Sequence, residues 1–354
     1  MRGRQILVEP RAGGGAAAAL VVDGRLEDLL VDPAPGDAAP RPEAIYRAVA
    51  GRPMKGLGGV MVELGGGATG FLRGARLPAP GARLLVQVAT WAEPGKAAPV
   101  TTRIRLKGRL AILTPEAPGV NISRAIEDGA AREALAAAAA ATMAGAGAEP
   151  GLGLIVRSLA ATADPAALAA EIAGLRARVE GLTAGGRSDP PGLLAAAPGA
   201  AGEAARDWPL AADEAVEVHP EALARAGIWE TAAGLLRPEA ALPGGAWMAI
   251  EPTRALVAVD VNTGGDASPA AAIAANVAAA RELPRQLRLR GLGGQVVVDL
   301  APLAKAERGR IEQALTAALR RDGVETTIAG WTPLGHLELN RKRARRPLAE
   351  LPLR

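Results

Sequence analysis

Two segments decide the fold of the C-terminal part of this chain: Leu256-Val-Ala-Val-Asp-Val261 and Val296-Val-Val-Asp-Leu300. Both are short apolar runs of the kind that form buried strands. Between them, Ser268-Pro269 predicts the start of a helix that ends at Gly291, because serine caps a helix N-terminus and proline suits the first turn. A second amphipathic helix is predicted over residues 304–321. This order predicts two neighbouring parallel strands joined by a right-handed crossover.

Each of these strands carries an aspartate near its carboxyl end, Asp260 in the first and Asp299 in the second. Ligand sites of open α/β sheets gather at this edge, so we expect the two carboxylates to lie close together. Close carboxylates in an apolar setting repel each other unless a cation lies between them. Asn262 shares the face of Asp260 and adds a third oxygen. Oxygen ligands without Cys or His favour Mg²⁺, which would position and activate a water for phosphodiester chemistry. Spacing alone leaves a second interpretation open, in which both aspartates only cap turns.

The N-terminal two-thirds of the chain is predicted to contain several short strands and two helices. The first strands are predicted at residues 5–9, 17–22 and 26–31. Strands at 59–63, 70–72, 83–88, 100–106 and 110–113, separated by turn signals, indicate a small closed barrel. An alanine-rich helix over 130–146, a strand at 153–156 and a helix from 165 to about 182 follow. The Gly-, Pro- and Ala-rich stretch 183–207 predicts a linker.

Composition narrows the classes of protein. The 354 residues contain no cysteine, which excludes disulfide scaffolds and thiolate zinc sites. The length predicts two or three folded units. Residues 281–354 hold 15 Lys and Arg against 8 Asp and Glu, so the positive charge is concentrated at this end. No stretch approaches the roughly 20 apolar residues of a membrane span, and we expect a cytoplasmic protein without one.

Leu256 to Gly265, together with Arg285 to Leu300, resembles the catalytic segment of the ribonuclease E/G family. The resemblance continues through Leu334-Gly-His-Leu-Glu-Leu-Asn-Arg-Lys-Arg343. It implies a short, ribonuclease G-like, Mg²⁺-dependent endoribonuclease. Such an enzyme cuts single-stranded RNA in ribosomal RNA processing and messenger RNA turnover, leaving a 5′-phosphate and a 3′-hydroxyl. Asp260 and Asp299 would then ligate the metal, and Asn262 would help to orient the site.

The same resemblance implies an α+β multidomain fold. Residues 1–35 and a shortened 201–243 would form a degenerate RNase H-like subdomain, with an S1 (OB-type) RNA-binding barrel at 36–118 inserted in it. Residues 119–200 would form a 5′-sensor α/β region, and 244–354 a DNase I-like catalytic subdomain with a basic C-terminus. Gly70-Phe-Leu72 and Lys96 to Pro115 carry the likeness to the barrel, and Gly153 to Ser158 the likeness to the sensor.

Carried over position by position, the resemblance assigns RNA contacts outside the metal site. Gly108, Arg157 and Ser158 would hold the 5′-terminal phosphate, while Phe71 and Lys96 would contact single-stranded RNA. The chemistry is suitable, because arginine offers a planar fork to phosphate and an aromatic ring stacks on an unpaired base. Two plainer interpretations remain: Phe71 as a residue of the barrel core, and Arg157 as a member of a surface ion pair.

The run Arg341-Lys-Arg-Ala-Arg-Arg346 places five positive charges in six residues. It is either a solvated end of the chain or a track for RNA phosphates. Within it, Arg341, Lys342 and Arg343 are the candidate RNA contacts.

The sequence departs from the family pattern in two ways that affect function. The cysteine pair that links two subunits through zinc is missing, so no zinc-linked dimer is expected, although a homodimer of another kind stays open. Glu325 stands where the family often has a further sensor arginine, which predicts weaker dependence on a 5′-monophosphate. Two rival functions stay open: a non-catalytic RNA-binding protein derived from the family, and a DNA-directed phosphodiesterase.

Overall fold

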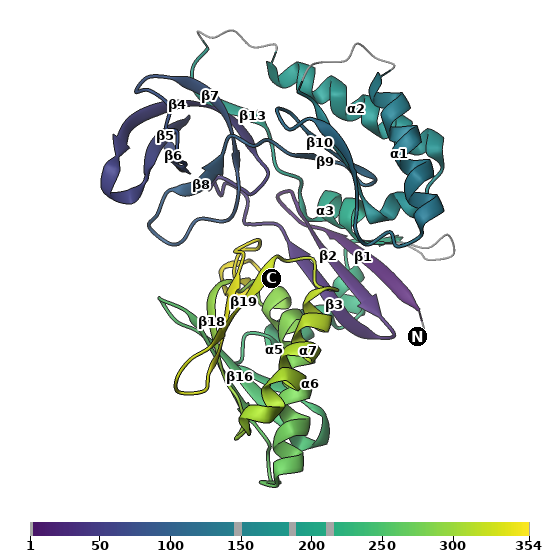
Figure 1. Ribbon diagram of the computed structural model, residues 1–354, viewed down its shortest axis with the longest axis vertical. Helices are drawn as coiled ribbons and strands as arrows, with labels where there is room; N and C mark the ends of the chain where they lie inside the picture. The colour runs from purple at the N-terminus through teal and green to yellow at the C-terminus, as the bar shows by residue number, and fades with distance from the viewer. Residues whose placement is uncertain (1–2, 145–150, 184–188, 210–215, 354) are drawn as a thin grey trace. The chain divides into compact units, whose positions relative to one another are not determined.

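The computed structural model describes residues 3–144, 151–183, 189–209 and 216–353 of the chain (Figure 1). The chain forms two compact units. We call Met1–Asp37 with Leu210–Arg354 the outer unit, and Ala38–Pro209, which interrupts it in sequence, the inserted unit. The mixed α+β content agrees with the prediction. Across the described ranges, no helix combines the length and the apolar character needed to cross a membrane.

A six-stranded sheet in the outer unit, the C-terminal sheet, has the strand order β15-β16-β17-β18-β20-β19. Its strands are β15 (Glu239–Ala241), β16 (Trp247–Pro252), β17 (Val257–Asn262), β18 (Gly294–Asp299), β19 (Thr326–Trp331) and β20 (Leu337–Arg341). Strands β17 and β18 pair in parallel, as predicted, and every other pair in this sheet is antiparallel. Helix α6 (Pro269–Leu289) connects β17 to β18, and the predicted cap is present: Ser268 Oγ accepts a hydrogen bond from Ala271 N. A short turn, η4 (Lys305–Glu307), precedes α7 (Arg308–Leu319).

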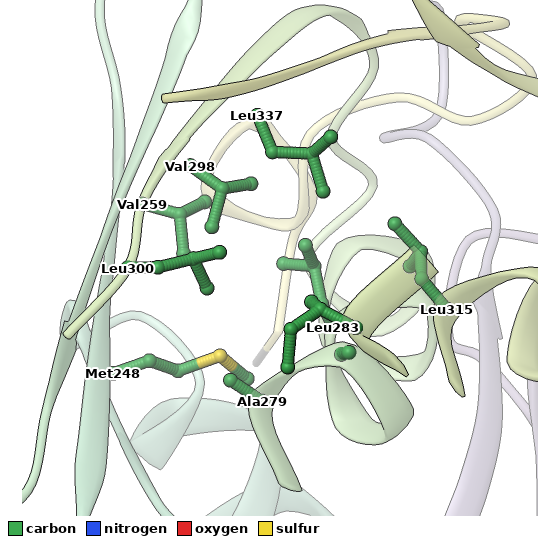
Figure 2. A pocket seen from close by; sticks show the side chains of 10 residues that line it. Met248, Val259, Ala279, Leu283, Val298, Leu300, Leu315 and Leu337 are labelled. Carbon is green, nitrogen blue, oxygen red and sulfur yellow. The ribbon is translucent and has the colours of Figure 1, made fainter. Parts of the chain in front are cut away.

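One face of this sheet is covered by α6 and α7 (Figure 1). Figure 2 shows Val259, Val298 and Leu337 pointing from their strands toward Leu283 and Leu315 of the two helices, around a small apolar pocket. All five side chains are 3% exposed or less. Because side chains alternate along a strand, the residues next to these point to the opposite, open face of the sheet.

Asn276 of α6 fixes the chain just after β18. Its side chain is fully buried, its Nδ2 donates to Ala301 O at 2.9 Å, and its Oδ1 accepts from Ala301 N at 3.0 Å. Both polar groups of Ala301 are therefore satisfied inside the core, two residues beyond Asp299. Pro284 lies inside α6 without ending the helix.

The N-terminal strands β1 (Arg4–Pro10), β2 (Ala16–Val22) and β3 (Arg25–Val31) confirm the three predicted strands. They form a sheet with β14 (Val216–Val218), which pairs in parallel with β1. Two short helices, α4 (Ala222–Arg225) and α5 (Ile228–Gly234), pack against this sheet. The buried Glu9 binds both helices, since its carboxylate accepts from Leu223 N and from Trp229 Nε1 at 2.9 Å each. The turn η5 (Leu348–Glu350) contributes Leu348 to the same core.

The inserted unit begins with a closed barrel of five strands, consistent with an S1 or OB fold; the predicted barrel is confirmed, but the strand predicted at 110–113 belongs to a different sheet. The strands are β4 (Ile45–Met54), β5 (Gly59–Gly65), β6 (Ala68–Arg73), β7 (Arg83–Val88) and β8 (Ala98–Thr101), with a turn η1 (Lys55–Leu57) between β4 and β5. Pairing of β4 with β7 closes the barrel. The finer assignment of RNase H-like, S1 and DNase I-like subdomains stays a prediction.

The rest of the inserted unit is a second sheet packed against two helices. The sheet contains β9 (Leu106–Lys107), β10 (Ala111–Thr114), β11 (Gly119–Ile122) and β12 (Gly153–Val156), and the helices are α1 (Gly129–Ala144) and α2 (Pro165–Thr183). Asp164 Oδ1 accepts from Ala166 N at 2.8 Å, as expected of the predicted cap. A turn, η2 (Ser158–Thr162), separates β12 from α2. The strand predicted over 100–106 is wrong in extent, because β8 ends at Thr101 and β9 begins at Leu106.

The predicted linker over 183–207 is wrong in its described part. It contains β13 (Gly192–Ala195), which pairs with β4, and α3 (Ala200–Asp207). Alanine explains the error: Ala200 and Ala204 are 4% and 0% exposed, so small side chains that suggest a linker in sequence pack closely here. Residues 184–188 lie outside the described residues, as do 145 and 146 of the predicted alanine-rich helix.

Replacing Asn276 with Ala should lower the free energy of unfolding by about 1–3 kcal/mol, because it leaves the buried N–H and C=O of Ala301 without partners. Urea unfolding followed by Trp fluorescence measures the change. The matched control is Asn340→Ala, at an exposed position of the same unit, which should change stability by no more than about 0.5 kcal/mol. Equal effects of the two substitutions would contradict the role given to Asn276.

Candidate functional site

The parallel pairing of β17 and β18 places Asp260 directly opposite Asp299. Both side chains are exposed and lie on the open face of the C-terminal sheet, since Val259 and Val298 beside them point into the core. Asp299 is the last residue of its strand. The sheet therefore brings together the two carboxylates that the sequence singled out.

Hydrogen bonding around the aspartates does not support the turn-cap interpretation. Asn262 donates from Nδ2 to Asp260 Oδ2 at 2.9 Å, so the third predicted site residue holds the first in one orientation. Across the described ranges, no backbone N–H donates to the carboxylate of Asp260 or Asp299, and no Lys or Arg forms an ion pair with either. Two neighbouring negative charges are thus left without positive compensation from the protein.

His336 is a site residue that the sequence reasoning did not assign. Its Nε2 lies 3.6 Å from Asp299 Oδ1. It stands here because β20 runs antiparallel to β18, with Val298 opposite Leu337, so the preceding residue faces Asp299. His336 lies within the stretch Leu334 to Arg343 that resembles the family, but only the register of β20 against β18 shows that its neighbour is Asp299.

A divalent ion fits the donor set of this site. In the described part of the chain, no group of three or more His, Cys, Asp or Glu side chains is already arranged to hold a metal. An open pair of carboxylates is nevertheless the usual protein contribution to a Mg²⁺ site, because Mg²⁺ keeps several of its waters. Asp260 and Asp299 could provide that pair, with the Asn262 amide next to it.

The barrel residues predicted to contact RNA lie on its outside. Phe71 is half-buried in β6 between the buried Gly70 and Leu72, so the barrel-core interpretation is wrong. The Arg73 guanidinium lies 5.6 Å from the centre of the Phe71 ring. Lys96 lies in the β7–β8 loop, 67% exposed, where its Nζ is 2.6 Å from Glu93 Oε2. An outward ring next to the Arg73 guanidinium suits a single-stranded nucleic acid.

Two of the three predicted phosphate-sensor residues lie together, but they bind each other. Arg157 donates from Nη1 to Gly108 O at 2.6 Å and from Nη2 to Asp207 Oδ1 at 2.7 Å. Gly108 N donates to Ala111 O at 2.8 Å. Ser158 is exposed at the start of η2. The ion-pair interpretation of Arg157 is therefore confirmed, and a phosphate at this place would have to share Arg157 with Asp207.

Glu171 supplies a second internal anion beside Gly108. Its carboxylate accepts from Arg109 N at 3.0 Å, Leu110 N at 2.7 Å and Ala111 N at 2.8 Å. Successive backbone N–H groups of this kind form a concave anion site. The sequence gives no sign of this contact, because Glu171 comes about 60 residues later on a different element.

A group of ion pairs connects Glu43, which lies just before the first barrel strand β4, to α3. Glu43 lies 2.6 Å from Lys107 Nζ and 2.6 Å from Arg206 Nη1, and Arg206 Nη2 lies 2.7 Å from Asp207 Oδ2. Burial alone would raise the pKa of Glu43, but Lys107 and Arg206 outweigh it and hold that pKa below its ordinary value of 4.5. Burial likewise opposes ionisation of Asp207, while Arg206 and Arg157 lower its pKa.

The structure does not fit the predicted RNA contact at Arg341. This side chain is 2% exposed in β20, where its Nη1 lies 2.6 Å from Asp322 Oδ2 and donates to Thr326 Oγ1 at 2.8 Å. Arg288 binds the other oxygen of Asp322. Arg341 therefore belongs to a buried ion-pair group that holds β20 in place.

The end of the basic run is also engaged inside the outer unit. Arg345 Nη2 donates to Asp28 Oδ2 at 2.8 Å, and Arg346 pairs with Asp37 and with Glu350, the latter at 3.1 Å. Lys342 is exposed and Arg343 is half-buried. Arg341, Arg345 and Arg346 thus have structural roles, and RNA contacts at Lys342 and Arg343 stay predictions.

Glu325, which stands in for a sensor arginine by resemblance, is exposed just before β19 in the outer unit. Gly108, Arg157 and Ser158 all belong to the inserted unit.

Together, the fold and the site define a two-unit α+β protein with a closed five-stranded barrel and a carboxylate pair on an open sheet face. A profile of the Ribonuclease E/G family matches residues 105–220 and 209–344, and the chain belongs to this family. Over 313 residues it is 30% identical to ribonuclease E of Nostoc sp. The aligned region covers 78% of this chain and 45% of that protein. It is 28% identical over 315 residues to ribonuclease E of Synechocystis sp., covering 78% and 46%. Against ribonuclease G of Escherichia coli K12 the identity is 35% over 109 residues, covering 29% and 22%. The chain thus spans less than half the length of these relatives.

Stability at acid pH should depend on Glu43. Because its pKa in the folded state lies below the ordinary 4.5, its ion pairs stabilise the fold fully above that ordinary value and are lost as the pH falls through the lowered pKa. The free energy of unfolding of the wild-type protein should therefore fall more steeply over this range than that of Glu43→Gln, as measured by urea unfolding at a series of pH values. Glu63→Gln, at an exposed glutamate of the same unit, is the control and should follow the wild type. Parallel curves for all three proteins would rule out this role of Glu43.

Proposed function

We propose that this chain is a Mg²⁺-dependent endoribonuclease that cleaves single-stranded RNA. The observation that carries the proposal is the direct opposition of Asp260 and Asp299 on an exposed sheet face, where no Lys or Arg of the described residues pairs with either. Family membership supports the choice of reaction, since the relatives reported above are named ribonuclease E and ribonuclease G. By the same resemblance, the physiological role would be ribosomal RNA processing and messenger RNA turnover in the cytoplasm.

The chain's own residues would prepare the site for this chemistry. The Asn262 amide holds the carboxylate of Asp260 in one orientation, and Asn276 fixes the backbone segment that follows Asp299. Mg²⁺, when bound, would activate a water and neutralise charge that develops on the phosphate. The open face leaves both carboxylates accessible to a nucleic-acid backbone. By the family resemblance, the 3′-oxygen would be the leaving group and would take up a proton, so that the products would carry a 5′-phosphate and a 3′-hydroxyl.

RNA would be held by groups outside the carboxylate pair. Phe71 and Lys96 on the barrel, with Lys342 and Arg343 after β20, are the proposed contacts to single-stranded RNA. Arg341 is left out because it is buried. Gly108, Arg157 and Ser158, the 5′-phosphate contacts implied by the resemblance, would hold a phosphate only weakly, because Asp207 competes for Arg157.

Replacing Asp299 with Asn should abolish Mg²⁺-dependent cleavage while preserving folding and RNA affinity. Loss of one of two metal carboxylates removes several kcal/mol of transition-state stabilisation, so the rate should fall by at least about a thousandfold. A labelled single-stranded oligonucleotide, incubated with and without Mg²⁺, measures cleavage, and filter binding measures affinity. Glu251→Gln, at an exposed carboxylate on the same face of β16, is the matched control and should cleave normally.

The same assay separates the rival functions. Binding of RNA by the wild-type protein without any products would favour a non-catalytic RNA-binding protein. Equal cleavage of the DNA version of the oligonucleotide would favour a general phosphodiesterase, because only RNA offers a 2′-hydroxyl. Unchanged turnover by the Asp299→Asn protein would refute the proposed site.

Substrates with a 5′-monophosphate and with a 5′-hydroxyl should be cleaved at similar rates. The reason is that Arg157 is already paired with Asp207, and Glu171 already fills the N–H groups next to Gly108. Single-turnover rates on the two forms of one oligonucleotide test this. A preference of tenfold or more for the phosphorylated form, about 1.4 kcal/mol, would show that phosphate displaces these internal carboxylates.

A further inference from the structure

The imidazole of His336 lies beside Asp299, one of the two carboxylates of the candidate site. Its Nε2 is 3.6 Å from Asp299 Oδ1, longer than a hydrogen bond. Within the described residues, its ring makes no hydrogen bond, although it is only 34% exposed and Asp299 is 65% exposed. The imidazole thus lies close to Asp299, and its Nε2 is available to bind another atom.

The backbone of His336 is fixed, so the closeness follows from the fold. His336 O accepts from Thr332 N at 2.9 Å, and His336 N donates to Thr332 Oγ1 at 3.1 Å. The next residue, Leu337, is 2% exposed in the core, which directs His336 to the open face. Asp260, Asp299 and His336 therefore follow one another across β17, β18 and the start of β20.

The separation of the two side chains fits a shared ion better than any direct bond. Two donors that bind one divalent ion at about 2.1–2.2 Å each, with an angle of about 90–110° between them, lie roughly 3.0–3.6 Å apart. The observed 3.6 Å is within this range. In the described part of the chain, Asp260, Asp299 and His336 do not yet form a group of three that could hold a metal, so Asp260 would have to give up its hydrogen bond from Asn262 and rotate to join.

We propose that His336 is a nitrogen ligand of the divalent ion held by Asp299. This inference rests on the proposed metal site. It gives the site a preference for transition-metal ions, because imidazole binds these ions better than Mg²⁺. A pair of carboxylates alone would not produce this preference. The site should therefore bind Mn²⁺ more tightly than Mg²⁺, and His336 should account for the difference.

Mn²⁺ is the probe that tests the proposal, and the chain offers a matched control. It contains only two histidines. The other, His219, follows β14 in the N-terminal sheet, where its Nδ1 accepts from Glu221 N at 3.0 Å. Pulsed EPR of bound Mn²⁺ detects the ¹⁴N of a directly coordinated imidazole, and EPR titration of free Mn²⁺ gives the affinity. The full-length wild-type protein is compared with His336→Gln, His219→Gln and Asp299→Asn, each checked for folding by circular dichroism.

The wild-type and His219→Gln proteins should show the ¹⁴N signal. His336→Gln should lose it and bind Mn²⁺ at least about tenfold more weakly, while its Mg²⁺ affinity, measured by competition, stays within about threefold. A retained ¹⁴N signal or an unchanged Mn²⁺ affinity in His336→Gln, with Mn²⁺ binding lost in Asp299→Asn, would overturn the role of His336 alone. Unchanged Mn²⁺ binding in Asp299→Asn would instead overturn the metal site, and the proposed function with it.

Discussion

The parallel pairing of β17 with β18 is the constraint on which the candidate site depends. Its register puts Asp260 opposite Asp299, while Val259 and Val298 fill the core on the other face. Helix α6 is the crossover that makes parallel pairing possible, and it also carries Asn276, which fixes the segment beyond Asp299. Like charges directly opposite each other destabilise a sheet, so this arrangement has a cost unless a cation binds between them.

Other carboxylates in this chain are paired with backbone N–H groups or arginines, which makes the exposed pair Asp260 and Asp299 unusual. Glu171 satisfies three backbone N–H groups, Asp207 binds two arginines, and Asp322 binds Arg288 and Arg341. The chain has 41 Lys and Arg, yet in the described ranges none pairs with Asp260 or Asp299. The protein thus supplies positive charge at the structural carboxylates but, within the described residues, no Lys or Arg at Asp260 and Asp299.

Local sequence patterns predicted the helices and strands of the site. They missed contacts that depend on the pairing of strands far apart in the sequence. The apolar runs ending in Asp260 and Asp299, and the helix cap between them, are local signals, and the structure confirms the parallel pair. The contact of His336 with Asp299 depends on a strand register that one sequence does not contain. For Arg341 a signal existed: Leu337, Leu339 and Arg341 alternate along β20, so extending the strand through the basic run would have predicted its burial.

The effect of the carboxylate pair on stability and on RNA affinity helps to decide whether this protein is an enzyme or only binds RNA. In a protein that only binds RNA, two uncompensated carboxylates on the open sheet face would weaken the fold and repel the phosphate backbone. Neutralising either one would then improve both stability and affinity. With a divalent ion between them, the same pair attracts phosphate and keeps the sheet intact. The open face of β17 and β18 therefore makes physical sense as a metal-dependent site, and much less sense as a plain RNA-binding surface.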